Sequence, residues 1–156
     1  KSKGADTFRL QWNSVVYEPG EVRVTAYRKN QKWAEAVQRT AGEASRLEVK
    51  ADRDPIAGDG ADLCYVTVRV LDARGVLVPR ADPLLRFAVS GPVEIAGVCN
   101  GDATDLTGFQ AAHQRVYNGL CQVILRGVAG RQGTAALTVR SDNPRIPEAT
   151  VRIRVR

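Results

Sequence analysis

Residues 64–70 read CYVTVRV, a stretch in which apolar residues occupy every even-numbered position and larger or more polar residues occupy the odd ones. Because successive side chains of a β-strand point to opposite faces of a sheet, this alternation predicts a strand with one face in a core. After Leu71, residues 72–75 read DARG and are of types that favour a tight turn. The stretch therefore predicts a half-buried strand that turns back at its end.

The same two-residue period recurs on both sides of this stretch. It predicts further strands at 47–49, 76–78, 85–89, 93–98, 121–125, 135–139 and 151–155, with turn-forming residues between them. Seven or eight short strands within about 110 residues are typical of an immunoglobulin-like β-sandwich. Residues 103–117 lack the alternation and are predicted to form a long loop that contains the single histidine, His113.

A smaller unit is predicted in front of the sandwich. Alternation indicates three strands, at 8–12, 22–27 and 33–39, with turns at 17–20 and 29–31. We therefore predict an all-β chain with two domains. Residues 1–43 form a partial small β-domain, a three-stranded meander, and residues 44–156 form the immunoglobulin-like β-sandwich.

The composition favours a globular protein over a membrane or nucleic-acid-binding one. Of the 156 residues, 44% are hydrophobic, and no apolar run approaches the roughly 18 residues that a membrane-spanning helix needs. The net charge of +6 comes mainly from arginines that alternate with apolar residues along the predicted strands. Such cations are expected on solvent-facing sheet positions, so no nucleic-acid partner is predicted. Because the chain begins with Lys1 and contains no methionine, we expect a piece of a longer protein.

The residues that could carry chemistry match no catalytic or metal-binding pattern. His113 has no nucleophile in a recognisable setting beside it, and CxxC, HExxH and phosphate-loop motifs are absent. Acids do lie close together in predicted turns, where they are common for conformational reasons. These pairs are Asp59 with Asp62, Asp102 with Asp105, and Glu18 with Glu21. Calcium binding by the acids of 52–62 or 100–105 is an alternative to turn formation, but their spacing matches no calcium loop. We predict no catalytic residue, no metal site and no cofactor.

Three aromatic residues of the first segment are candidates for stacking on a sugar ring: Trp12, Tyr27 and Trp33. Tyr27 and Trp33 flank a predicted turn, where side chains reach solvent. Trp12 shares a strand face with Phe8 and Leu10, so a place in a core is its alternative. An exposed aromatic pair would favour a carbohydrate-binding or adhesion role, and burial would favour a structural one. The aromatic content of 6% is low for a dedicated carbohydrate-binding module.

The cysteines allow two interpretations. Cys64 and Cys121 both lie on predicted inward strand faces, at a separation that suits the inter-sheet disulfide of an immunoglobulin fold. The tryptophan that usually packs against that disulfide is missing, and a lone buried cysteine is a common small apolar residue. Two buried thiols are therefore the preferred alternative. Cys99 would be unpaired in either case.

Longer stretches of the sequence resemble a known family. WNSVVYEPGEVRVTAY at 12–27, followed by RTAG at 39–42, resembles the small β-domain after the catalytic barrel of many bacterial family 2 glycoside hydrolases. The stretch VTVRVLDARGVLVPRADPLLRFAVSGPVEIAGVCNGDAT at 66–104, together with NGLCQVILR at 118–126, resembles the immunoglobulin-like domain that ends those enzymes.

The resemblance implies a function for a parent protein. That protein would be a bacterial β-galactosidase-type enzyme, periplasmic, surface-attached or secreted, that removes terminal β-linked galactose or a related sugar by a retaining mechanism. Its catalytic glutamates would lie on a barrel absent from this chain, which would be a non-catalytic accessory region in contact with the other domains. Lys1-Ser2 is similar to the end of a turn inside the family's small domain. The meander would then have an open edge, so we predict that residues 1–43 dock against the second domain or self-associate.

Overall fold

The computed structural model describes residues 11–156, in which every regular element is a β-strand. The all-β fold class is therefore confirmed. By its internal contacts the chain separates into two units, Lys1–Thr40 and Ala41–Arg156, each of which is described by itself. Within residues 11–156, no helix has the length and apolarity required to cross a membrane.

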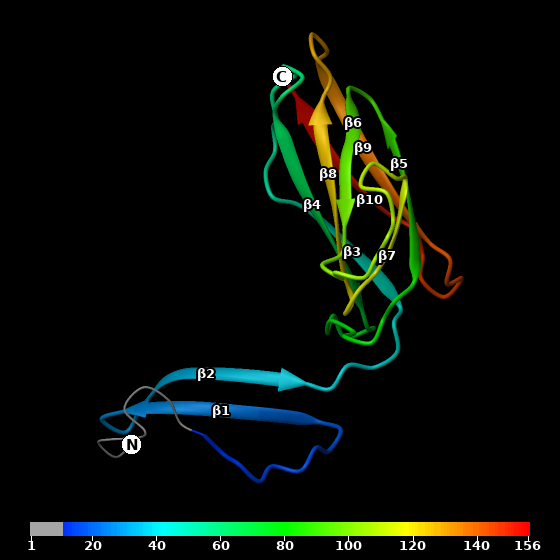
Figure 1. Cartoon of the computed structure of the whole chain (residues 1–156). Coiled ribbons are helices and arrows are strands. Elements are labelled where there is room, and N and C mark those ends of the chain that lie inside the picture. The colour runs from blue at the N-terminus through cyan, green and yellow to red at the C-terminus, as the bar shows by residue number, and fades with distance from the viewer. Residues whose placement is uncertain (1–10) are drawn as a thin grey trace. The chain divides into compact units, whose positions relative to one another are not determined.

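The first unit contains a two-stranded antiparallel sheet. It consists of β1 (Glu21–Arg28) and β2 (Gln31–Arg39), labelled in Figure 1. Lys29 and Asn30 join them with φ values of 49° and 60°, the left-handed conformation of the tight turns that suit strand twist. The predicted strand at 8–12 falls mostly on residues 1–10, as does Lys1-Ser2, outside the described residues, and Trp12 lies in no strand.

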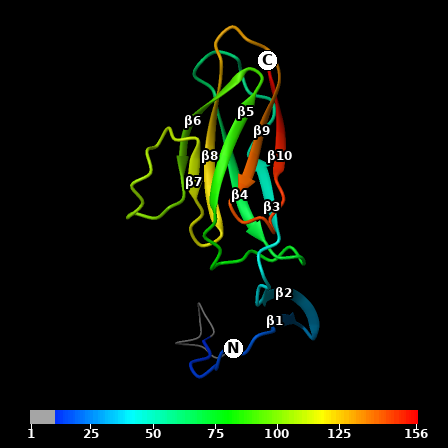
Figure 2. The same cartoon turned by 90° about the vertical axis from the view of Figure 1, so that its right-hand side faces the viewer.

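The second unit contains two four-stranded antiparallel sheets, which lie face to face in Figures 1 and 2. The first sheet has the order β3-β4-β8-β6 and the second β10-β9-β5-β7. The strands are β3 (Arg46–Ala51), β4 (Leu63–Leu71), β5 (Leu84–Ser90), β6 (Val93–Cys99), β7 (His113–Arg115), β8 (Leu120–Gly127), β9 (Gly133–Ser141) and β10 (Ala149–Val155). The sandwich prediction is confirmed, including every strand predicted between 85 and 155.

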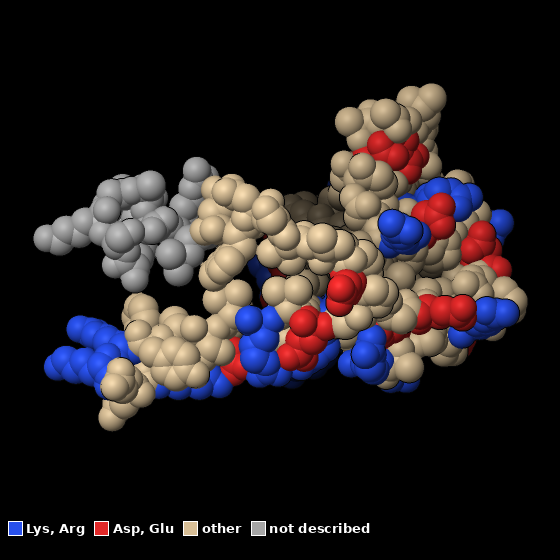
Figure 3. Space-filling model, turned by 90° about the horizontal axis from the view of Figure 1, so that it is seen from below, with Lys and Arg blue, Asp and Glu red and all other residues tan. Residues whose placement is uncertain are grey.

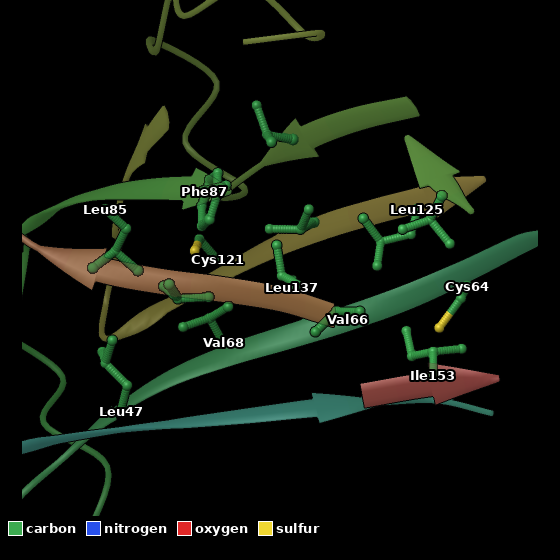
Figure 4. Packing of buried hydrophobic residues seen from close by; sticks show 14 of the residues in the cluster. Leu47, Cys64, Val66, Val68, Leu85, Phe87, Cys121, Leu125, Leu137 and Ile153 are labelled. Atoms are coloured by element: carbon green, nitrogen blue, oxygen red, sulfur yellow. The ribbon is translucent and has the colours of Figure 1, made fainter. Parts of the chain in front are cut away.

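The core lies between the two sheets and follows the predicted alternation. The even-numbered residues of β4 from Cys64 to Val70 are completely buried. Leu125 of β8 extends this layer, and Leu137 of β9 and Ile153 of β10 face it from the other sheet, as Figure 4 shows. Each buried leucine or isoleucine contributes about 1.5–3 kcal/mol relative to an exposed one. Apolar burial on both inner faces therefore holds the sheets together.

The turn after β4 forms as predicted and is held by a buried carboxylate. Asp72 is 2% exposed, and its side chain accepts hydrogen bonds from the backbone N–H groups of Arg74 and Val76, at 2.9 and 2.8 Å. It also accepts one from the N–H of Gly42 at 2.8 Å. Gly75 adopts a φ of 83°, which favours glycine. The charge of Asp72 is thus offset by backbone donors, and it ties the start of the second unit to the sandwich.

Residues 103–117 differ in part from the predicted loop. The segment runs from β6, at the edge of one sheet, to β7, at the edge of the other. Within it, His113–Arg115 pairs with β5, and Gln114 lies opposite Leu85 with only 3% exposure. A three-residue strand with a polar residue on its inner face carries no hydrophobic alternation. The alternation pattern therefore could not predict this short strand.

Candidate functional site

The three candidate sugar-stacking residues are exposed in the first unit. The exposed fractions are 63% for Trp12, 68% for Tyr27 and 70% for Trp33. Trp33 sits at an irregularity of the β1–β2 ladder, beside the pair formed by Tyr27 and Lys32. An extra residue at such a bulge redirects the neighbouring side chains. The structure therefore leaves these rings available for contact with a ligand or with another surface.

The two inward-facing cysteines do not form the inter-sheet disulfide. Cys64 and Cys121 lie on β4 and β8, which are neighbours in the same sheet, and both are free thiols. Cys64 is opposite Leu125, whereas Cys121 is opposite Val68, four positions further along. Four positions correspond to about 13 Å along a strand, about twice the largest Cα separation that a disulfide allows. Figure 4 shows the two sulfur atoms well apart.

The environment of these thiols makes them poor nucleophiles. Burial raises the pKa of Cys64 to about 11 and that of Cys121 to about 12. A thiol with so high a pKa carries almost no thiolate near neutral pH, and the thiolate is the reactive form. Cys64 and Cys121 therefore act as small apolar residues of the core.

The acids of residues 52–62 are occupied by local hydrogen bonds. Asp59 accepts the N–H groups of Ala61 and Asp62, at 2.8 and 2.7 Å, and Asp62 accepts the N–H of Ala57 at 2.7 Å and pairs with Arg53. These backbone hydrogen bonds lower the pKa of both carboxyl groups. A general acid needs the opposite shift, a raised pKa. Within residues 11–156, no group of three or more candidate metal-binding side chains is found.

The most organised polar cluster lies in the loop between β6 and β7. The Oδ2 atom of Asp105 accepts hydrogen bonds from the amide groups of Asn100 and Gln114, at 2.6 and 2.7 Å. Its Oδ1 atom accepts the N–H of Thr107 at 2.8 Å. A pocket of about 340 Å³ opens beside this cluster and is also lined by Phe109. We call Asn100, Asp105, Thr107 and Gln114 the Asp105 cluster.

The Asp105 cluster favours the ionised carboxylate. Hydrogen bonds from the side chain and backbone of Thr107, followed by those from Asn100 and Gln114, lower the pKa of Asp105. The carboxylate therefore acts as a hydrogen-bond acceptor that holds the conformation of the loop, and not as a proton donor. Thr104 is held in the same loop, since its hydroxyl donates to Asp102 at 2.8 Å.

Asp105→Asn should loosen this loop in a pH-dependent way. An asparagine would direct its NH₂ group at N–H donors, whichever way the amide is turned. Because the folded pKa of Asp105 is lowered, its stabilising effect is complete above the ordinary value of about 3.9 and is lost as pH falls through the folded pKa. The midpoint of thermal unfolding should therefore differ most between wild type and variant near pH 6–7, and the difference should shrink in acid.

Circular dichroism melts between pH 7 and pH 2 provide the measurement. The same exchange at the exposed Asp82 is the control and should leave the midpoint unchanged. A difference between wild type and Asp105→Asn that stays constant down to pH 2 would show that the charge of Asp105 has no role.

Sequence reasoning missed two buried polar residues, Asp72 and Gln114. The role of Asp72 could have been predicted from the sequence. An Asp directly after a buried strand, with Gly three residues later, favours a turn that the Asp side chain stabilises. The burial of Gln114 could not have been predicted in this way, because it depends on the pairing of β7 with β5. The Asp105 cluster as a whole therefore depends on a long-range strand pair.

The surface of the sandwich carries many ion pairs. Figure 3 shows both basic and acidic side chains on the side of the chain that is seen from below. Two pairs lie on the outer side of the first sheet, between Arg69 and Glu48 at 2.8 Å and between Arg126 and Glu94 at 2.6 Å. Exposed pairs contribute only about 0–1 kcal/mol each. Their main effect is to neutralise that face.

Comparison with protein families gives two matches along the chain. Residues 47–151 match the family described as glycoside hydrolase family 2 C-terminal domain 5. Residues 1–34 match a domain of unknown function, DUF4982. The first match spans the whole sandwich except its outermost residues.

Comparison with individual proteins gives relatives that are much longer than this chain. A β-galactosidase of Bacteroides ovatus, BoGH2A, is 38% identical over 145 residues, which are 93% of this chain but 17% of that protein. A glycosyl hydrolase family 2 member from Bacteroides cellulosilyticus has a similar structure, with a TM-score of 0.84 and 26% identity over 91% of this chain and 18% of that one. A β-glycosidase from Bacteroides vulgatus is also similar in structure, with a TM-score of 0.82 and 27% identity. This match covers 90% of this chain and 18% of that one.

Proposed function

This chain belongs to the glycoside hydrolase family 2 C-terminal domain 5 family, and from that premise we propose that it is a non-catalytic accessory region of a larger bacterial family 2 enzyme. The enzyme would be of the β-galactosidase type and would act in the periplasm, at the cell surface or outside the cell. The observation that carries the proposal is the coverage of the relative, since 93% of this chain corresponds to only 17% of a β-galactosidase.

The chemistry of the described residues supports a role without catalysis. Several carboxyl groups, among them Asp59, Asp62 and Asp105, have lowered pKa values because they accept hydrogen bonds from fixed donors. A retaining glycosidase needs one carboxyl group with a raised pKa about 5 Å from a second one, in a cleft that holds the sugar. The sandwich instead offers a rigid core, which suits a region that supports or positions other domains.

The partners proposed for this region are the catalytic and other domains of the parent enzyme. We also propose that residues 1–43 and 44–156 are separate domains. In the described residues β1 and β2 pair only with each other, so each has an unpaired edge. An exposed strand edge is a template for pairing with another chain. Residues 1–43 would therefore dock on another domain or pair with a second copy.

A chimera of the Bacteroides ovatus β-galactosidase tests the accessory role. The segment of that enzyme that corresponds to this chain is replaced by residues 1–156, or deleted. We expect the replacement to retain the thermal midpoint and kcat/KM of the intact enzyme within a few-fold. Deletion should lower the midpoint, because it exposes surfaces that the region covers.

Two results would contradict the accessory role. The first is a chimera as unstable as the deleted enzyme. The second is hydrolysis of a chromogenic β-galactoside by the isolated chain, abolished by replacement of one carboxylate.

A carbohydrate-binding function is the second candidate, and the exposure of Trp12, Tyr27 and Trp33 favours it. In that case titration of the isolated chain with galactosides would change the tryptophan fluorescence in a saturable way. The accessory proposal expects no such change at millimolar sugar.

A further inference from the structure

The second sheet of the sandwich has an unbalanced charge. Its four strands, β5, β7, β9 and β10, contain five arginines and no Asp or Glu. Their basic residues are Arg86, His113, Arg115, Arg140, Arg152 and Arg154, and all of these are exposed. Because they alternate with buried residues, they lie on the outer side of the sheet. We call this outer side the arginine face.

Strand register brings several of these residues together. Arg86 of β5 lies directly opposite His113 on one neighbouring strand and Arg140 on the other. Adjacent strands are about 4.8 Å apart, so the three side chains form one row across the sheet. Arg152 of β10 lies opposite Ala136, four residues along β9 from Arg140. The distance from Arg86 to Arg152 across the face is therefore about 16 Å.

Three arginines of the arginine face have no acidic partner. Arg140 pairs with Glu148 at 2.7 Å, and Arg154 pairs with Asp54 at 3.2 Å. Arg86, Arg115 and Arg152, in contrast, make no ion pair with any residue in 11–156. Arg115 donates instead to the backbone carbonyl of Asp82 at 2.8 Å. Like charges directly opposite one another on a sheet destabilise it. On the other sheet, Arg69 pairs with Glu48 and Arg126 pairs with Glu94. The outer side of that sheet therefore carries less net positive charge than the arginine face.

The floor of the arginine face is flat and polar. Between Arg86 and Arg152 the outward positions carry only small side chains, among them Ala88, Thr138 and Thr150. The hydroxyl groups of Thr138 and Thr150 are 3.1 Å apart and bridge two strands. Such a surface suits an extended chain that lies across the strands, rather than a small molecule that needs enclosure.

We propose that the arginine face binds an anionic polysaccharide through its uronate carboxylates, as the substrate-holding surface of the accessory region. The inference rests on the proposed function, because a family 2 glycoside hydrolase acts on glycans. A repeating anion is required, since one exposed charge pair contributes too little to hold a single carboxylate. A polymer engages several pairs at once, which raises the effective concentration of each further contact. Single-stranded nucleic acid is disfavoured, because the outward positions of β5, β9 and β10 carry no aromatic platform for bases.

The test measures binding of residues 1–156 to polygalacturonate, with neutral galactan as the control polymer. The Arg86→Gln/Arg152→Gln variant removes two of the three unpaired arginines. The matched variant Lys50→Gln/Arg126→Gln removes the same charge from the outer side of the other sheet. We expect salt-sensitive binding of polygalacturonate and none of galactan. The first variant should bind about tenfold more weakly, since each exposed pair contributes a few-fold, and the second should bind as wild type.

Three outcomes would overturn the proposal. They are equal weakening by both variants, absence of polygalacturonate binding at low salt, and binding of polyglutamate as tight as that of polygalacturonate. The last outcome would assign the face to an acidic protein surface. Thermal midpoints of both variants check folding, and loss of the like-charged neighbour should not lower that of Arg86→Gln/Arg152→Gln. These results are independent of the chimera, since an accessory region can stabilise its enzyme without holding substrate.

Discussion

Leu137→Ala should lower the free energy of unfolding of the sandwich by about 2–5 kcal/mol. Leu137 is completely buried at the middle of β9, where it faces the other sheet (Figure 4). Its removal takes apolar atoms out of the core and leaves a cavity that antiparallel strands, tied by hydrogen bonds on both sides, cannot collapse to fill. Denaturant unfolding followed by far-ultraviolet circular dichroism measures the loss. Tryptophan fluorescence would not, because Trp12 and Trp33 both lie in the first unit.

Leu106→Ala is the matched control. Leu106 is 97% exposed in the loop between β6 and β7, so the same truncation should change the free energy by less than about 0.5 kcal/mol. Similar losses for the two variants would mean that Leu137 does not lie in a close-packed core.

Gly91→Ala should cost about 2–4 kcal/mol, for a reason that involves no loss of apolar contact. Gly91 lies in the turn between β5 and β6 with a φ of 81°, which favours glycine. A Cβ atom there would lie 2.5 Å from the carbonyl oxygen of Thr134 and 2.8 Å from the Cα of Ala135. Both atoms belong to backbone, so β9 or the turn would have to move. The midpoint of urea unfolding should fall accordingly.

Gly130→Ala separates the two contributions to the cost at Gly91, which are the positive φ and the steric clash of the Cβ atom with β9. Gly130 also has a positive φ, 71°, but a Cβ atom there would meet nothing within 4 Å. It should therefore lose only the conformational contribution, about 1 kcal/mol. Equal effects at Gly91 and Gly130 would show that the turn does not approach β9 as closely as the structure indicates.

These predictions separate the scaffold from the surfaces that would carry function. Substitutions between the sheets should change stability, whereas those of Arg86 and Arg152 should change binding and leave stability nearly unaffected. The Asp105 cluster belongs neither to the core nor to the arginine face. Its members are polar and partly buried, and they hold the shape of one loop.

The sequence alone determined the longer strands of the sandwich, their inner faces and the family. The alternation in residues 64–70 correctly predicted which side chains of β4 are buried, because a strand's two-residue period is a local property of the backbone. Turn chemistry was equally local, as Asp72 and Gly75 illustrate. The stretches at 66–104 and 118–126 carried the resemblance that the family match to residues 47–151 confirms.

Only the tertiary structure decided which strands are neighbours. Periodicity placed Cys64 and Cys121 on inner faces. In the structure, β4 and β8 are neighbours in one sheet, and the two cysteines lie four positions apart along it. In the same way, burial of Gln114 and the row containing Arg86 exist only because β5 pairs with β7 and β9. Strand pairing joins segments distant in sequence, and its register depends on how both sheets pack together. A local pattern therefore indicates which face a residue occupies, whereas the fold determines what lies beside it.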